Sequence, residues 1–259
     1  MSKIQAVILD WAGTAVDYGC FAPVNAFALA FQSCGISPTV DEIRAPMGML
    51  KRDHIRTMLA MDRLKSQWIE VYGSEPDDSS VEKIYSVFEE SLMRSLSDYA
   101  APKPGTLEAV ARLREMGIVI GSTTGYTDSM MDVVAKRAAE QGYSPDALVT
   151  PDEVEGMGRP YPYMIFANMQ HLRIPSVESV VKVGDTVADI LEGKNAGVCS
   201  LGVLEGSSVL GLTQIEYEAL SEAEQMKILN KARQTFLDAG ADDVILNLEQ
   251  LPDWLEKNC

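Results

Sequence analysis

The sequence predicts an α/β protein in which a Rossmann-like, doubly wound parallel sheet is interrupted by an inserted helical cap domain. Near the N-terminus, one short apolar strand is followed by a long stretch with helical periodicity and no convincing strand. From about residue 100 onward, apolar strands alternate with helices, which is typical of a parallel sheet covered on both faces. We therefore expect an α/β core domain of residues 1–18 and 100–259, and a helical cap domain of residues 19–99.

The first strand is expected at residues 4–9, and the cap follows it as a series of helices. A helix over residues 21–34 is indicated by Pro23 near its start and Gly35 just past its end. Three further helices are expected because apolar residues recur at spacings of three and four. They begin near Met49, Ser66 and Ser79.

The core resumes at residues 99–104, where Pro102, Pro104 and Gly105 mark a break. This segment and residues 18–22 are the two joins between cap and core, and we expect both to act as hinges. Strands then follow at residues 118–123, 147–149, 180–183, 198–203 and 244–246. Helices are expected at residues 106–116, 128–141, 161–172, 187–196, twice between 213 and 239, and at the C-terminus.

Composition and charge limit the partners of this chain. With 46% apolar and 23% charged residues, it can bury a substantial core. The formal net charge of −16 would repel nucleic acid and anionic membranes, so neither is expected as a partner. No signal peptide fits the N-terminus, and no apolar run approaches the ~20 residues of a membrane span. We expect a cytoplasmic protein.

The cysteines do not suggest a zinc site or a disulfide framework. They lie far apart and include no CxxC pair. We expect reduced thiols at Cys20, Cys34, Cys199 and Cys259.

Polar side chains follow several of the expected strands. Asp10 follows the first, Thr124 and Gly125 the second, Arg159 lies in the loop MGRPYP after the third, and Asp185 follows the fourth. Because ligands bind outside the carboxyl ends of the strands in such sheets, these residues are expected to converge on one site.

Each of these residues also has a structural alternative. Asp10 could start a turn, and Asp189 could form a capping box with Thr186. A threonine, Thr124 or Thr127, could cap a helix. The basic residue Arg159 could be an exposed loop cation. Taken together, a catalytic site is favoured, because the carboxylates of Asp10 and Asp185 suit Mg²⁺, while hydroxyls, helix-start amides and a cation neutralise phosphoryl oxygens.

These motifs resemble the four motifs of the haloacid dehalogenase superfamily, in the same order. They are Asp10-x-Ala12-Gly13-Thr14, a strand ending at Thr124, Arg159, and Gly184-Asp185-x3-Asp189. The strings ILDWAGTAVDYGCFAP, PMGMLKRDHIR, GSTTGYT, GRPYP and KVGDT are similar to its phosphonatase family, which cleaves the C–P bond of phosphonoacetaldehyde. The resemblance implies that Asp10 is the nucleophile and that a cap lysine forms a Schiff base with the substrate. It further implies Mg²⁺ at Asp10, Asp185 and the backbone carbonyl of Ala12, with Asp189 orienting metal-bound waters or Asp185.

The alanine at position 12 agrees with this chemistry. In a phosphatase, an acid two residues after the nucleophile protonates the departing alkoxide, and such acid catalysis is worth roughly 10²–10⁴ in rate. A carbon leaving group needs an electron sink instead, because a bare carbanion is too basic to leave. An iminium next to the C–P bond supplies that sink.

Lys51 is the expected Schiff-base residue. A lysine near the start of a cap helix is ordinarily exposed and solvated, and this alternative is displaced by the match of PMGMLKRDHIR. Nearby cations and burial would favour the neutral amine that attacks an aldehyde. The resemblance places Cys20, Met47 and His54 around the aldehyde, with His54 as a proton shuttle. It places Thr124, Gly125 and Arg159 on the phosphoryl oxygens.

Three other functions remain open from the sequence. One is a phosphomonoesterase of the same superfamily acting on a small phosphate ester. Another is a carbon–carbon lyase that uses the Schiff base without phosphoryl transfer. The third is a binding or regulatory protein that keeps the fold. The resemblance also implies a homodimer, for which the apolar helix at residues 21–34 could provide the interface.

Overall fold

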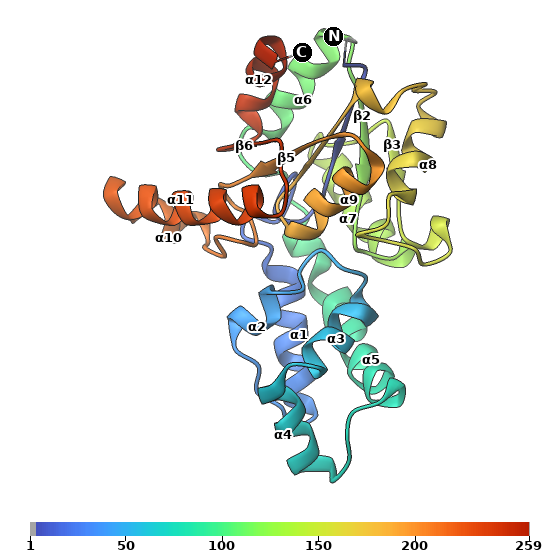
Figure 1. Cartoon of the computed structure of the whole chain (residues 1–259), viewed down its shortest axis with the longest axis vertical. Coiled ribbons are helices and arrows are strands. Elements are labelled where there is room, and N and C mark those ends of the chain that lie inside the picture. Colours follow the sequence, from blue (N-terminus) through green and yellow to red (C-terminus); the bar gives the residue numbers. More distant parts are fainter. Residues whose placement is uncertain (1–3, 259) are drawn as a thin grey trace.

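The computed structural model describes residues 4–258 of the chain. Figure 1 shows two parts: a sheet with flanking helices, and below it a group of helices formed by the segment between β1 and α6. Within the described residues, the sheet has six strands in the order β3-β2-β1-β4-β5-β6, and every pairing is parallel. The predicted fold class is confirmed.

The strands are short and mostly buried. They are β1 (Ala6–Leu9), β2 (Val119–Thr123), β3 (Ala147–Val149), β4 (Val180–Gly184), β5 (Cys199–Val203) and β6 (Asp243–Ile245). In β1, Leu9 lies opposite Ser122 on one side and Val183 on the other. The strand order therefore reverses direction between β1 and β4, and this switch point is where such sheets bind ligands.

Both faces of the sheet are covered, because alternate side chains of a strand point to opposite faces. Val7 and Leu9 belong to an apolar cluster that includes residues of α6, α7 and α12. Ala6 and Ile8 belong to a second cluster on the other face, with Ile165 of α8. This explains why β1 reads as a continuous apolar run.

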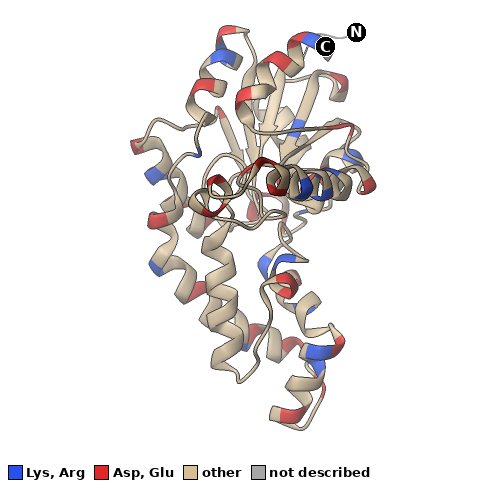
Figure 2. Cartoon of the chain, turned by 90° about the vertical axis from the view of Figure 1, so that its left-hand side faces the viewer, with Lys and Arg blue, Asp and Glu red and all other residues tan. Residues whose placement is uncertain are grey.

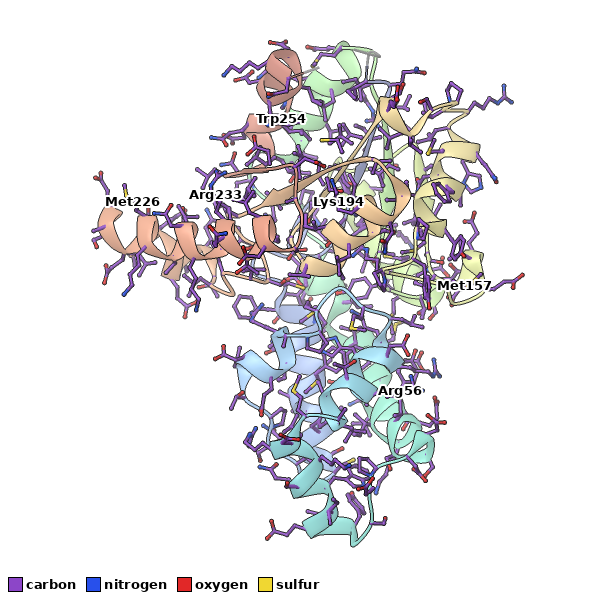
Figure 3. The ribbon with its side chains drawn as sticks, viewed as in Figure 1. Arg56, Met157, Lys194, Met226, Arg233 and Trp254 are labelled. Atoms are coloured by element: carbon purple, nitrogen blue, oxygen red, sulfur yellow. The ribbon has the colours of Figure 1, made fainter. Side chains whose placement is uncertain are left out.

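The helices around the sheet lie close to their predicted positions. They are α6 (Thr106–Glu115), α7 (Asp128–Glu140), α8 (Tyr163–His171), α9 (Val187–Ala196), α10 (Gln214–Glu218), α11 (Glu222–Asp238) and α12 (Leu251–Asn258). Short 3₁₀ turns lie at Leu96–Tyr99, Asp152–Val154, Val177–Ser179 and Leu248–Gln250. Helix α8 begins two residues later than predicted, because a residue before proline, here Tyr161 before Pro162, avoids helical backbone. Figure 3 shows α11 projecting from the sheet with Met226 near its outer end, where this side chain is 63% exposed.

The remaining helices form the expected helical segment. They are α1 (Phe21–Ser33), α2 (Val40–Arg44), α3 (Lys51–Leu59), α4 (Asp62–Tyr72) and α5 (Asp78–Ser95). Helices α1 and α5 pack together, with the rings of Phe27 and Phe88 stacked at a centroid distance of 4.1 Å. Sequence reasoning missed the five-residue α2, although its capping box of Thr39 and Glu42 was a readable signal.

The two chain segments that join these helices to the sheet lie side by side. Val16 and Pro102 form an antiparallel bridge, and the Lys103 amide donates to the Ala15 carbonyl at 2.9 Å. The carboxylate of Asp17 then accepts the amides of Phe21 and Ala22 at 3.0 and 3.1 Å, which fixes the start of α1.

Charged residues of both signs are interspersed along the helices, as Figure 2 shows. Between residues 4 and 258, no helix has the length and apolar character needed to cross a membrane. Cys20 and Cys34 are buried free thiols, whereas Cys259 lies outside the described residues.

Candidate active site

Asp10 stands at the end of β1, at the switch point of the sheet. Its amide donates to the Val183 carbonyl at 3.0 Å, and its side chain is buried. The loop that follows turns tightly at Gly13, whose φ is +89°. A Cβ at Gly13 would lie 2.1 Å from Oδ2 of Asp185, so only glycine lets this loop approach the second acid.

Asp185 follows β4 and is completely buried. Its Oδ2 accepts the Ser208 amide at 2.7 Å, and its Oδ1 accepts the Thr14 hydroxyl at 3.4 Å. Burial raises the pKa of Asp185 well above its ordinary value, and the neighbouring charges of Asp10 and Asp189 raise it further.

The three acids form a candidate metal centre. One oxygen from each of Asp10, Asp185 and Asp189 lies within 4.8 Å of the other two. Buried carboxylates that repel one another are stabilised by a cation, and hard oxygen ligands suit a divalent metal ion. The donor set therefore fits a metal ion.

Asp189 is held differently from the other two acids. It forms the capping box with Thr186 that was one of its structural alternatives. Its Oδ1 pairs with Lys182 at 2.8 Å and with Arg159 at 3.1 Å. Burial alone would raise its pKa, yet these two cations hold the pKa of Asp189 below its ordinary value. One carboxylate oxygen of Asp189 is therefore already paired with two buried cations.

Arg159 is a buried cation at the centre of an ion-pair network, so the alternative of an exposed loop residue is wrong. Its Nη2 donates to Oδ1 of Asp10 at 2.7 Å and to the Thr123 hydroxyl at 2.8 Å. Its Nε donates to Oε2 of Glu192 at 2.9 Å. The charge of Arg159 therefore lies beside the expected nucleophile.

Sequence reasoning missed the outer part of this network. Lys182 and Glu192 are fully buried, and the Lys182 amine also donates to the Thr123 hydroxyl at 3.0 Å. A signal was present, because Lys182 interrupts the otherwise apolar strand VVKVG. A buried charge requires a partner of opposite sign, but the sequence does not say which acid provides it.

Lys51 is the first residue of α3 and is only 3% exposed, so the alternative of a solvated lysine is wrong. Its Nζ lies 5.0 Å from the ring centroid of Tyr126, a residue that sequence reasoning also missed within GSTTGYT. Burial lowers the pKa of Lys51 to about 8, with Arg159 acting in the same direction and nearby acids opposing it. The amine is therefore partly neutral near physiological pH.

His54 lies three residues after Lys51 on α3 and is fully buried. Its Nε2–H donates to the Ile43 carbonyl at 2.8 Å, and its ring stacks on Phe27 at a centroid distance of 3.9 Å. Within residues 4–258 the buried Nδ1 has no hydrogen-bond partner. Burial first, and then the charge of Lys51, lowers the pKa of His54 well below its ordinary value. The imidazole is neutral, with a bare Nδ1.

The turn after β2 supplies the remaining predicted residues. The Thr124 hydroxyl accepts the Tyr126 amide at 3.1 Å, so it shapes a turn. The N-cap position of α7 is occupied by Thr127, which makes no side-chain capping bond. A Cβ at Gly125 would lie 3.2 Å from the Gly48 carbonyl oxygen, so Gly125 permits the close approach of the helical segment.

These side chains meet around one cavity of about 20 Å³. Of the predicted residues, the cavity is lined by Asp10, Ala12, Cys20, Met47, Lys51, Thr124, Gly125, Arg159 and Asp185. Residues that were not predicted complete the lining: Pro23, Gly48, Tyr126 and Thr186. His54 and Asp189 lie outside it. The volume has room for about one water molecule.

Comparison with known proteins agrees with this geometry. Residues 4–197 match the family of haloacid dehalogenase-like hydrolases. A phosphonoacetaldehyde hydrolase from Lysinibacillus sphaericus is 52% identical over 250 residues, covering 96% of this chain and 93% of that protein. One from Bacillus cereus is 48% identical over 254 residues, covering 98% and 96%.

A solved structure supports the same relationship. The crystal structure of a phosphonoacetaldehyde hydrolase-like protein from Oleispira antarctica has a TM-score of 0.96 at 35% identity, covering 99% of this chain and 92% of that one. This chain therefore belongs to the haloacid dehalogenase-like hydrolases and, within them, to the family of the phosphonoacetaldehyde hydrolases.

Proposed function

We propose that this chain hydrolyses the C–P bond of phosphonoacetaldehyde to acetaldehyde and phosphate. The observation that carries the proposal is one cavity shared by a buried amine, Lys51, and a buried carboxylate, Asp10, with Ala12 at the place of a second acid. Relatives that are 52% and 48% identical along nearly the whole chain carry the name of this activity.

Lys51 and Asp10 divide the reaction between carbon and phosphorus. The neutral amine of Lys51 adds to the aldehyde, and loss of water gives an iminium. Asp10 attacks phosphorus, and the electrons of the breaking C–P bond move into the iminium to form an enamine. Water then cleaves the aspartyl-phosphate, releasing phosphate. Protonation of the enamine carbon and hydrolysis of the imine release acetaldehyde and restore the amine.

The oxygens of the phosphonate need positive charge around them. Arg159, the Thr124 hydroxyl and the Gly125 amide are proposed to hold these oxygens, since all three residues line the cavity. Asp10, Asp185 and the Ala12 carbonyl are proposed to hold Mg²⁺, which when bound neutralises phosphonate charge and the repulsion between the two acids. Asp189 is proposed to hold Arg159 through their ion pair and to orient Asp185.

Three further residues are proposed to serve the lysine. His54 lies outside the lining, and its Nε2–H donates to the Ile43 carbonyl while its Nδ1 has no partner among residues 4–258. We propose that this Nδ1 shuttles protons during imine formation and hydrolysis. Cys20 and Met47 form the wall around the aldehyde, because both line the cavity and both are buried.

Residues 19–99 are proposed to act as a mobile cap on a core of residues 1–18 and 100–259. The cavity is lined from both sides, by Lys51 and Met47 of the helical segment and by Asp10 and Asp185 of the sheet, so movement of the cap would change access for substrate and product. The joins at residues 18–22 and 99–104 are proposed as the hinges, and Pro102 in the second join is bridged to Val16, just before the first. We further propose that the enzyme is a cytoplasmic homodimer that binds neither nucleic acid nor membrane, in agreement with its net charge of −16.

The replacement Lys51→Arg tests the function directly. An arginine keeps the positive charge but forms no imine, so release of acetaldehyde and phosphate should fall by at least about 10³-fold. Borohydride should inactivate the wild-type enzyme only in the presence of phosphonoacetaldehyde and should add a two-carbon or phosphono-ethyl group to Lys51, located by mass spectrometry.

The matched control is Lys65→Arg, a partly exposed cap lysine that pairs with Glu75. It should retain full activity and full borohydride sensitivity. If Lys51→Arg cleaved phosphonoacetaldehyde at the wild-type rate, C–P cleavage would not pass through an imine at Lys51. Hydrolysis of a small phosphate ester that Lys51→Arg left intact would indicate a phosphomonoesterase instead. If Asp10→Asn still released acetaldehyde, cleavage would not pass through phosphoryl transfer to this acid.

A further inference from the structure

One loop contacts both joins between the cap and the core. This loop, residues 204–212, follows β5, and we call it the β5 loop. The Gly19 amide, in the first join, donates to the Gly206 carbonyl at 2.7 Å. The Lys103 amine, in the second join, donates to the Glu205 carbonyl at 2.6 Å. Both hinge segments are therefore attached to the β5 loop.

Arg44, the last residue of α2, adds a contact from the cap itself. Its Nη1 donates to the Gly19 carbonyl at 2.9 Å and to the Ser208 carbonyl at 3.1 Å. The guanidinium lies over the Phe21 ring, with its carbon 5.1 Å from the ring centroid. A Cβ at Gly211 would be only 2.7 Å from the Arg44 Nε, so the arginine lies directly against the β5 loop.

The same loop also holds the second acid of the candidate metal centre. The Ser208 amide donates to Oδ2 of Asp185 at 2.7 Å. Ser208 is 2% exposed and Asp185 is fully buried, so this bond is shielded from water. A single residue thus accepts a hydrogen bond from the cap through its carbonyl and donates one to Asp185 through its amide.

We propose that Arg44 is a positioning residue that couples closure of the cap to the orientation of the Asp185 carboxylate, an inference that rests on the proposed magnesium site. When the cap opens, Arg44 leaves the Ser208 carbonyl, and the β5 loop is free to shift its Ser208 amide away from Asp185. Coupling between two equilibria is reciprocal. Metal binding at Asp185 therefore favours the closed cap by the same factor by which closure favours metal binding.

The experiment uses the full chain without substrate, so it does not depend on turnover. Calorimetric titration with MgCl₂ should give a dissociation constant about 5- to 30-fold higher for Arg44→Gln than for the wild type, within the usual range of coupling. Hydrogen exchange of the Gly19 amide should slow on addition of MgCl₂ in the wild type and should not respond in Arg44→Gln. Arg44→Lys, which keeps the charge and can reach one carbonyl, should recover part of both effects.

Three further variants complete the test. Arg56→Gln is the matched control. Within residues 4–258, the ion pairs of Arg56 are to Asp53 and Asp78, and both of these residues lie in the cap. It should bind MgCl₂ as the wild type does. If Arg44→Gln failed to fold, Gly211→Ala would displace the guanidinium while leaving its charge in place, with the positive-φ Gly73→Ala as its control.

Several outcomes would overturn the inference. A dissociation constant within twofold of wild type would show that Arg44 only fastens the cap, even if exchange at Gly19 became faster. If MgCl₂ slowed exchange of the Gly19 amide equally in the wild type and in Arg44→Gln, Arg44 would likewise only fasten the cap. If the wild type bound no MgCl₂, the proposed coupling to metal binding would be refuted. By contrast, normal coupling in a protein that released no acetaldehyde would refute the proposed reaction alone.

Discussion

At the scale of single residues, burial decides what Lys51 can do. An amine with the ordinary pKa of 10.5 is neutral in about one molecule in 3,000 at pH 7, whereas a pKa of about 8 makes about one in ten neutral. The main cause is loss of solvent around the charged form, and the Arg159 guanidinium adds to it. A substantial share of the amine is therefore in the neutral form that the proposed attack on an aldehyde requires.

The pH dependence of imine formation follows from this pKa. In Asp10→Asn, which retains Lys51 but lacks the nucleophile, the initial rate of borohydride-trapped adduct should rise about tenfold from pH 7 to pH 9 and then level off. The rise has this direction because only the neutral amine attacks. The negative charge of Asp10 raises the pKa of Lys51 in the wild type. Its removal in Asp10→Asn should therefore place the midpoint slightly below that of the wild type. A rate that kept rising beyond pH 10 would contradict the buried amine.

Residue patterns at the strand ends predicted much of the site, but not its electrostatics. Asp10 and Asp185 could be found because each directly follows an apolar strand. Roles of individual residues at the cavity stay predictions. The partners of Lys182 could not be read from the sequence, because Asp189 and Glu192 reach it only after β4 and α9 have packed together.

At the scale of elements, the loop before α3 carries the lysine into the site. Gly48 has a φ of +88°, and a Cβ there would lie 2.4 Å from the Thr186 hydroxyl and 3.1 Å from the Ala188 side chain. The loop can therefore rest on the start of α9 only with glycine at this position. Thr186 in turn belongs to the capping box that fixes Asp189.

The replacement Gly48→Ala should hold the cap partly open. We expect kcat/KM for phosphonoacetaldehyde to fall about 10- to 100-fold, because small displacements of catalytic groups are costly. Gly73→Ala is the control: its φ is +74°, and no atom lies within 4 Å of an added Cβ. It should lower stability by about 1 kcal/mol from backbone strain and leave the activity unchanged. Equal activity of both variants would show that contact between Gly48 and Thr186 does not control closure.

At the scale of the whole molecule, the apolar residues of α1 serve mainly the interior of the cap. Phe27 and Phe31 are fully buried, whereas Leu29 on the same helix is 55% exposed. A net charge of −16 opposes association of two chains. The proposed dimer therefore needs an exposed apolar side chain at its interface, and Leu29 is such a side chain on α1.

Light scattering in solution should give twice the 28.3 kDa mass of one chain. Leu29→Glu should weaken the dimer, because it places a charge in the proposed interface. Ile215→Glu changes a side chain that is 80% exposed on α10, outside the cap, and should leave the mass unchanged. A wild-type mass of one chain would contradict the proposed homodimer.

The sequence by itself determined the fold class, the order of elements and the residues at the ends of β1 and β4, because apolar periodicity and turn residues are local properties of the chain. Only the tertiary structure decided that Lys51 is buried beside Tyr126, that Arg159 lies within an ion-pair network, and that Arg44 reaches Ser208. These contacts join residues far apart in the chain, and the burial that shifts a pKa depends on every segment packed around the group. A local pattern can place a charged side chain on a strand or helix, but only the assembled layers supply its partner.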